Sequence, residues 1–129
     1  MSQKIVDNWI SLAEYDLATA HDMSKAGRYL YVAFMCQQAV EKILKACYVK
    51  QHKSTPPYTH NLLRLIKELD FKDEMGDEMM AAIEELNSYY IESRYIEDIE
   101  ELSKLLTEAK AVSVLSSTKE LFEWIRVRL

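Results

Sequence analysis

The chain has 129 residues, a length that fits one domain with a single hydrophobic core and no need for a metal ion or disulfide. A net charge of -5 and a pI near 5.2 argue against a surface that holds duplex nucleic acid by general electrostatics, although a local basic site stays possible. Two glycines and two prolines leave few turn signals, so the composition favours a small number of long helices.

The N-terminal segment and the cysteines indicate the compartment. Asp7, Glu14 and Asp16 interrupt the segment where a signal peptide needs an apolar run, and no window approaches the roughly 18 apolar residues of a membrane span. Cys36 and Cys47 are about 16 Å apart along one expected helix, too far for a disulfide, so we interpret them as buried small residues. We expect a cytoplasmic protein without a membrane segment.

Apolar periodicity predicts an all-α fold, an up-and-down bundle of four long helices plus one short helix in a single domain over residues 1–129. The segment IEDIEELSK after Tyr95 is interpreted as a connection, with room for a helical turn. The last helix takes its apolar stripe from Leu105, Ala109, Val112 and the residues that follow at helical spacing. The expected helices run from Lys4 to Ser24, from the turn at Gly27 to Gln51, from His60 to Leu69, from Glu74 to Ser93, and from a start between Asp98 and Thr107 to the C-terminus.

The second helix carries polar residues beside its apolar face. Gln37, Glu41 and Lys45 are four apart, as are Gln38 and Lys42, so each set forms a row on one side of the helix. One interpretation is a helix edge joined by the Glu41–Lys45 ion pair. The alternatives are that the row meets a partner helix or holds a polar ligand.

Histidine is scarce, and the arrangement of the three histidines predicts no metal site and no cofactor. No two of them share a helix four residues apart, as paired metal ligands in a bundle do. His60 follows Thr59, the expected N-cap of the short helix, after Pro56 and Pro57 break the chain. A helix N-terminus disfavours the imidazolium, so His60 is a candidate to accept a proton; the alternative is a histidine that only hydrogen-bonds the loop.

The segment from Tyr89 to Tyr95 is the densest cluster of candidate ligand-binding residues. Arg94 is suited to holding a phosphate, and Tyr90 and Tyr95 offer stacking surfaces and hydroxyl groups for a base or ribose. A structural role at a helix end is the alternative. The acids at 97–101 oppose a polyanion there and would attract a basic partner surface.

The order and spacing of four features are similar to those of a known family. The features are Trp9 with Asp16-Leu17-Ala18, Phe34 with Gln37-Gln38-Ala39-Val40-Glu41-Lys42 and Leu44-Lys45-Ala46, Thr59-His60-Asn61-Leu62, and Arg94-Tyr95. Together they resemble the HEPN family, helical bundles named for higher eukaryotes, prokaryotes and proposed nucleotide binding. The resemblance implies a homodimer, often encoded beside a minimal nucleotidyltransferase as a toxin–antitoxin pair.

Many HEPN members are metal-independent ribonucleases whose motif is an arginine followed, after four to six residues, by a histidine. Arg94 matches the arginine, but the window after it, YIEDIEE, holds no histidine. Carboxylates are weak bases at neutral pH, and His60 substitutes only if the fold brings it beside Arg94. The aromatic content, two tryptophans and eight tyrosines, also favours an association surface.

The leading hypothesis is therefore a homodimeric module that lacks the usual catalytic histidine and binds a nucleotide, RNA or a nucleotidyltransferase partner. Its binding residues would be Arg94, Tyr95, Tyr90, Gln38, Glu41, Lys42 and Lys45. The first alternative is a metal-independent endoribonuclease toxin with Arg94 and His60 as catalytic residues. The second is a plain protein-interaction bundle in which Arg94 is structural.

Overall fold

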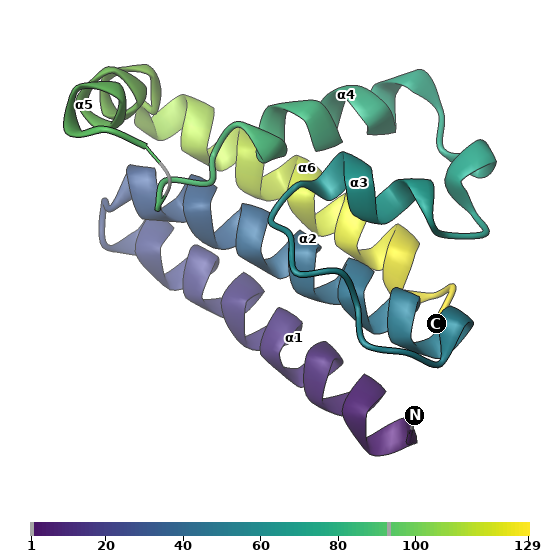
Figure 1. Ribbon diagram of the computed structural model, residues 1–129. Coiled ribbons are helices and arrows are strands. Elements are labelled where there is room, and N and C mark those ends of the chain that lie inside the picture. Colours follow the sequence, from purple (N-terminus) through teal and green to yellow (C-terminus); the bar gives the residue numbers. More distant parts are fainter. Residues whose placement is uncertain (1, 93) are drawn as a thin grey trace.

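The computed structural model describes residues 2–92 and 94–129, which form six α-helices and one 3-10 turn and no strand (Figure 1). The all-α prediction is confirmed. The helix expected to end at Ser93 ends before that residue, which lies outside the described residues. The elements are α1 (Gln3–Lys25), α2 (Tyr29–His52), α3 (Leu62–Lys67), the turn η1 (Lys72–Glu74), α4 (Asp77–Asn87), α5 (Ile96–Leu105) and α6 (Glu108–Arg126).

The first two helices form an antiparallel hairpin, with bounds within one residue of those predicted. Gly27 closes α1 with a positive φ of 74°, which glycine adopts without a steric penalty. Arg28 N–H donates to the carbonyl of Met23 at 2.8 Å, and Gly27 N–H donates to that of Ser24 at 3.2 Å. This pair of bonds is a Schellman motif, which satisfies the last carbonyls of α1 and reverses the chain.

Helix α2 is the centre of the molecule. It lies between α1 on one side and α3, α4 and α6 on the other (Figure 1), so most of its surface is buried, including three residues with polar side chains. Its buried apolar side chains pack against those of every neighbouring helix. This position explains why the polar row on α2, expected at the border of an apolar face, lies inside the protein.

The short helix α3 begins later than predicted. Its N-cap is Asn61, whose side chain accepts hydrogen bonds from the N–H groups of Leu63 and Arg64 at 3.0 and 3.4 Å. Thr59, the expected cap, instead accepts from Asn61 N–H at 3.1 Å in a turn before the helix. His60 therefore precedes α3 and does not lie in its first turn, which corrects the predicted position of this histidine.

Helix α4 ends at Asn87, six residues before the predicted end. Beyond it, Tyr89 and Ile91 are both buried against the core. Both side chains reach the core from the connecting segment between α4 and α5. Arg94 consequently lies in a connecting segment and not in a helical last turn.

The segment expected to be a connection after Tyr95 is helix α5, which corrects the sequence interpretation. Its acids Glu97 and Asp98 occupy the first turn, where they favour the positive end of the helix dipole. Leu102 is buried, while Leu105, which was assigned to the stripe of the last helix, is 71% exposed. The apolar spacing for a helix was present but was obscured by the acidic run.

Helix α6 begins at Glu108 after Thr107, whose hydroxyl accepts from Lys110 N–H at 3.2 Å. The predicted stripe was wrong at Ala109 and Val112, which are exposed. Leu115, Phe122 and Ile125 are buried as predicted, and a buried polar residue, Thr118, interrupts the apolar pattern of the observed stripe. That stripe is Ala111, Val114, Leu115, Thr118, Leu121, Phe122 and Ile125.

Candidate functional site

The polar row of α2 forms a hydrogen-bonded set in the interior. Gln37, Glu41 and Lys45 are 0%, 3% and 6% exposed, so each needs a partner within the protein. Lys45 Nζ lies 3.1 Å from Glu41 Oε2, and Gln37 Nε2 donates to Glu41 Oε1 at 3.2 Å. Lys45 also lies 5.6 Å from the centroid of the Trp9 ring on α1, an arrangement in which the ring attracts the ammonium. The carboxylate of Glu41 is thereby held in one orientation.

The loop before α3 places His60 on this set. His60 Nδ1 lies 2.9 Å from Glu41 Oε1, and the carbonyl of His60 accepts from Gln37 Nε2 at 3.1 Å. The histidine is therefore fixed through both its ring and its backbone. Its side chain keeps 36% of its surface exposed, so the ring reaches from the interior to solvent.

The contact with Glu41 sets the tautomer of the His60 ring. A carboxylate that already receives bonds from Lys45 and Gln37 acts as an acceptor, so Nδ1 of His60 donates. In the neutral ring the other nitrogen, Nε2, is then an acceptor. The arrangement orients a histidine base by a buried carboxylate, as catalytic histidines are oriented in hydrolases.

Tyr90 packs flat on His60, with ring centroids 4.1 Å apart and planes 14° apart. One face of this tyrosine is therefore covered by the imidazole, and its hydroxyl donates to Glu92 at 3.1 Å. Burial, followed by the hydrogen bond and charge of Glu92, raises the pKa of Tyr90 to about 12. The phenol stays protonated at neutral pH and holds the histidine ring in place.

Arg94 joins these residues in one cleft. The cleft has a volume of about 360 Å³ and is lined by His60, Asn61, Asn87, Tyr90 and Arg94. The Arg94 guanidinium donates through Nη2 to the carbonyl of Ser88, and its other donors have no partner among residues 2–92 and 94–129. His60 and Arg94 therefore line the same cleft.

Other residues proposed for the site lie elsewhere or have other partners. Tyr95 is the N-cap of α5, is 79% exposed and does not line the cleft. Gln38 donates to Gln37 Oε1 at 2.7 Å and supports the buried row from its edge. Lys42 pairs with Asp16 of α1 and so ties the two long helices together.

Three residues near the cleft were not identified from the sequence. Asn87 accepts from Leu62 N–H at 2.8 Å and donates to Asn61 at 3.2 Å, which joins the end of α4 to the start of α3. Tyr58 is 94% exposed and meets His60 edge-on, with ring centroids 5.9 Å apart. Asn61 was detectable as a preferred N-cap residue, but Asn87 and Tyr58 gave no signal because only the fold brings them near His60.

The remaining reactive groups do not enlarge the site. Over residues 2–92 and 94–129, no group of three histidine, cysteine or carboxylate side chains is arranged to hold a metal ion, and no helix is long and apolar enough to cross a membrane. Cys36 and Cys47 are buried and unpaired with each other. Burial raises the pKa of their thiols to about 11 and about 12, so both are poor nucleophiles.

The fold is an all-α helical bundle. The chain belongs to the HEPN family, because the family model described as the HEPN domain matches residues 6–128. This match confirms the resemblance drawn from the four sequence features. No curated protein shows significant similarity to the chain.

Two solved structures are similar in fold. TT1696 from Thermus thermophilus superposes with a TM-score of 0.81 at 22% identity, over 96% of this chain and 98% of that one. ST0689, described as an archaeal HEPN homologue, gives a TM-score of 0.72 at 21% identity, over 95% of this chain and 96% of that one. At such low sequence identities, these two similarities show a shared fold over almost the whole chain.

Proposed function

We propose that the cleft between His60 and Arg94 binds the phosphate of a nucleotide or of an RNA strand. The observation that carries the proposal is that one cleft holds a histidine fixed by a buried carboxylate and a guanidinium that has a single bonded donor among the residues that the structure describes. Arginine donors match phosphate oxygens in pairs, and the exposed ring of Tyr58 beside His60 offers a face on which a base can stack. The net charge of -5 limits this binding to a local site.

Binding is tested by fluorescence anisotropy with a labelled single-stranded RNA and by calorimetry with AMP and ATP. Arg94→Ala should weaken binding by about tenfold or more, because a charge-assisted bond to phosphate is lost. Arg64→Ala is the matched control, since Arg64 is exposed on α3 and does not line the cleft. Equal affinity of the folded Arg94→Ala protein and the wild type would contradict the proposal.

A second function, metal-independent RNA cleavage, is favoured by the orientation of His60. With the phosphate on Arg94, Nε2 of His60 would accept the proton of the adjacent 2′-hydroxyl as its oxygen attacks phosphorus. The phosphorus–O5′ bond then breaks, the leaving oxygen takes a proton from water, and a 2′,3′-cyclic phosphate remains. Glu41 serves as the positioning residue that keeps Nδ1 protonated.

Cleavage is tested with EDTA-treated protein and an RNA oligonucleotide, alongside Arg94→Ala and His60→Gln. The expected result is a product with a cyclic phosphate end, lost in both variants and absent when the attacking 2′-hydroxyl is replaced by hydrogen. If the RNA stays intact at a stoichiometric concentration of protein but still binds, the cleavage function is contradicted and only the binding function remains.

We further propose that the protein acts as a homodimer or beside a nucleotidyltransferase in a toxin–antitoxin pair. Exposed apolar side chains on α1, namely Ile5, Leu12 and Tyr15, support an association surface. The exposed acids of α5 suit a basic partner surface. Sedimentation equilibrium of the wild type and of Leu12→Asp tests self-association; a monomer at 100 μM would contradict the dimer, a concentration chosen as about a hundredfold above a micromolar Kd.

A further inference from the structure

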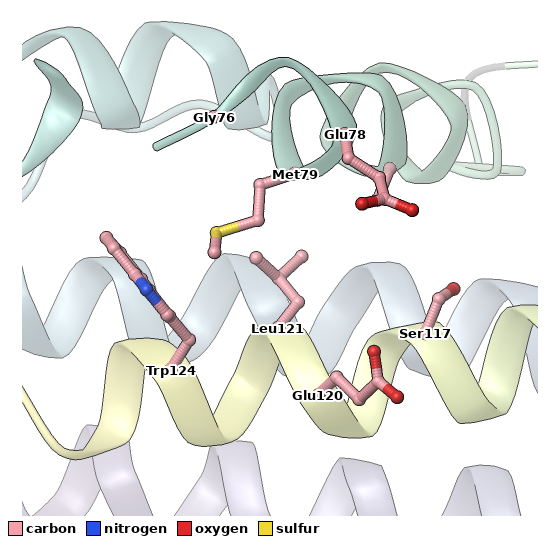
Figure 2. A pocket seen from close by; sticks show the side chains of 8 residues that line it. Gly76, Glu78, Met79, Ser117, Glu120, Leu121 and Trp124 are labelled. Atoms are coloured by element: carbon pink, nitrogen blue, oxygen red, sulfur yellow. The ribbon is translucent and has the colours of Figure 1, made fainter. Parts of the chain in front are cut away.

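A second cleft lies between α4 and α6 and shares no lining residue with the His60 cleft. Its volume is about 400 Å³, within the range of small-molecule sites. One turn of α4 and two turns of α6 form its walls, because residues three and four apart on each helix face the gap (Figure 2). The side chains that define its character are Glu78, Met79, Ser117, Glu120, Leu121 and Trp124.

The two ends of this cleft differ in polarity. Figure 2 shows Met79 and Leu121 pointing toward each other near the ring of Trp124, while Glu78 of α4 and Glu120 of α6 lie on the side of Leu121 away from Trp124. Leu121 is buried, and Met79 and Trp124 are half-buried. The apolar end is therefore formed by side chains that pack against the protein core, whereas Glu78 and Glu120 at the acidic end are exposed to solvent.

The acidic end lacks a positive partner among the described residues that line the cleft, since none of them is a lysine, arginine or histidine. Over the part of the chain that the structure describes, neither Glu78 nor Glu120 forms an ion pair. Arg128 lies 3.5 Å from the Trp124 centroid, but it does not line the cleft and bonds the carbonyl of Trp124.

We propose that this cleft binds a small organic cation, an amine carried on an apolar body. The body would pack on Met79, Leu121 and Trp124, and the ammonium would lie between Glu78 and Glu120. Among the described residues, no group of three histidine, cysteine or carboxylate side chains is arranged to hold a metal ion. A neutral or anionic ligand would leave the two carboxylates without a partner.

The proposal is tested by ¹H–¹⁵N NMR titration of the full chain with 2-phenylethylamine and with its neutral counterpart, 2-phenylethanol. The amine should cause saturable shifts at residues 76–82 and 117–124 and at the Trp124 indole N–H. The alcohol should bind about tenfold more weakly, because two partly exposed ion pairs contribute about 1–2 kcal/mol in total.

Two double variants separate the charge of the cleft from the charge of the protein. Glu78→Gln with Glu120→Gln keeps the shape of the cleft and should reduce amine affinity about tenfold, to that of the alcohol. Asp77→Asn with Glu123→Gln is the control, because both residues are exposed on the same helices and neither lines the cleft. Circular dichroism confirms that each variant is folded.

The outcomes are decisive in both directions. Amine-selective binding that disappears only in the cleft variant supports the proposal. Equal shifts with amine and alcohol, no saturable shifts in these two segments, or amine binding unchanged by the cleft variant would each overturn it. None of these results depends on nucleotide or RNA binding at Arg94, since the His60 cleft has different lining residues.

Discussion

The two sides of the His60 cleft are built in opposite ways. His60 is held by Glu41, by Gln37 through its carbonyl and by the flat contact with Tyr90. Arg94 lies in a connecting segment between α4 and α5 and bonds one carbonyl, that of Ser88. One wall is part of the protein interior, whereas the other is a surface segment.

Under the proposed function, this difference would give the two residues different roles. A group that must accept a proton benefits from a fixed tautomer and orientation, which the buried carboxylate supplies to His60. A group that binds a phosphate can adjust, since a guanidinium has several donors on a long side chain. The contrast predicts that stability depends on the His60 side of the cleft, and ligand affinity on the Arg94 side.

The largest expected effect is the loss of the buried carboxylate. Glu41→Leu leaves the ammonium of Lys45, which is 6% exposed, without its ion-pair partner and should lower the free energy of unfolding by about 3–5 kcal/mol. Urea denaturation measures the change. The double variant Glu41→Leu with Lys45→Met should recover most of the loss, and a double variant as unstable as the single would argue that packing, not charge, is responsible.

His60→Ala should have the next largest effect on stability. It removes one of the bonds to the buried Glu41 carboxylate and the contact with Tyr90, for a loss of about 1–3 kcal/mol. The same urea measurement applies, with His21→Ala as the control, because His21 is exposed and lies outside the cleft. If His60→Ala unfolds at the wild-type urea concentration, the fixed orientation of the ring is not supported by these contacts.

Tyr90→Phe should change the alkaline dependence of stability. Burial and Glu92 raise the pKa of Tyr90 from 10.0 to about 12, so the folded state holds the phenol proton more tightly than the unfolded chain does. The resulting stability is fully present below pH 10 and is lost as the pH rises toward about 12. Burial also raises the pKa values of Cys36, Cys47 and Tyr89, so the prediction concerns the difference between variant and wild type, measured by thermal unfolding from pH 8 to 11.

Arg94→Ala should have the smallest effect on stability, less than about 1 kcal/mol, because a single bond to a carbonyl on a surface segment is lost. The same protein should show the largest loss of RNA or nucleotide affinity. Parallel urea and anisotropy measurements on Arg94→Ala and His60→Ala therefore sharpen the comparison. A strongly destabilised Arg94→Ala would show that the two walls are equally structural.

The sequence by itself determined the all-α fold, the α1–α2 hairpin with its stop at Gly27, and the family. These follow from local causes, since apolar spacing, a glycine turn and a proline break act within a few residues. Arg94 and His60 were both selected as candidates because their chemistry is visible in the residue type. The sequence did not predict that Arg94 and His60 line the same cleft, because only the fold brings the two residues to one place.

Tertiary structure decided the rest. The chain leaves α4 at Asn87 and still buries Tyr89 and Ile91 beyond it, and the row at Gln37 is interior because helices and the loop of His60 pack around α2. Both outcomes depend on residues 19 to 25 positions apart, as in the contacts of Glu41 with His60 and of Leu62 with Asn87. Burial and hydrogen bonding across such separations override local propensity, because an unpartnered polar group inside a protein costs more free energy than a helical turn contributes.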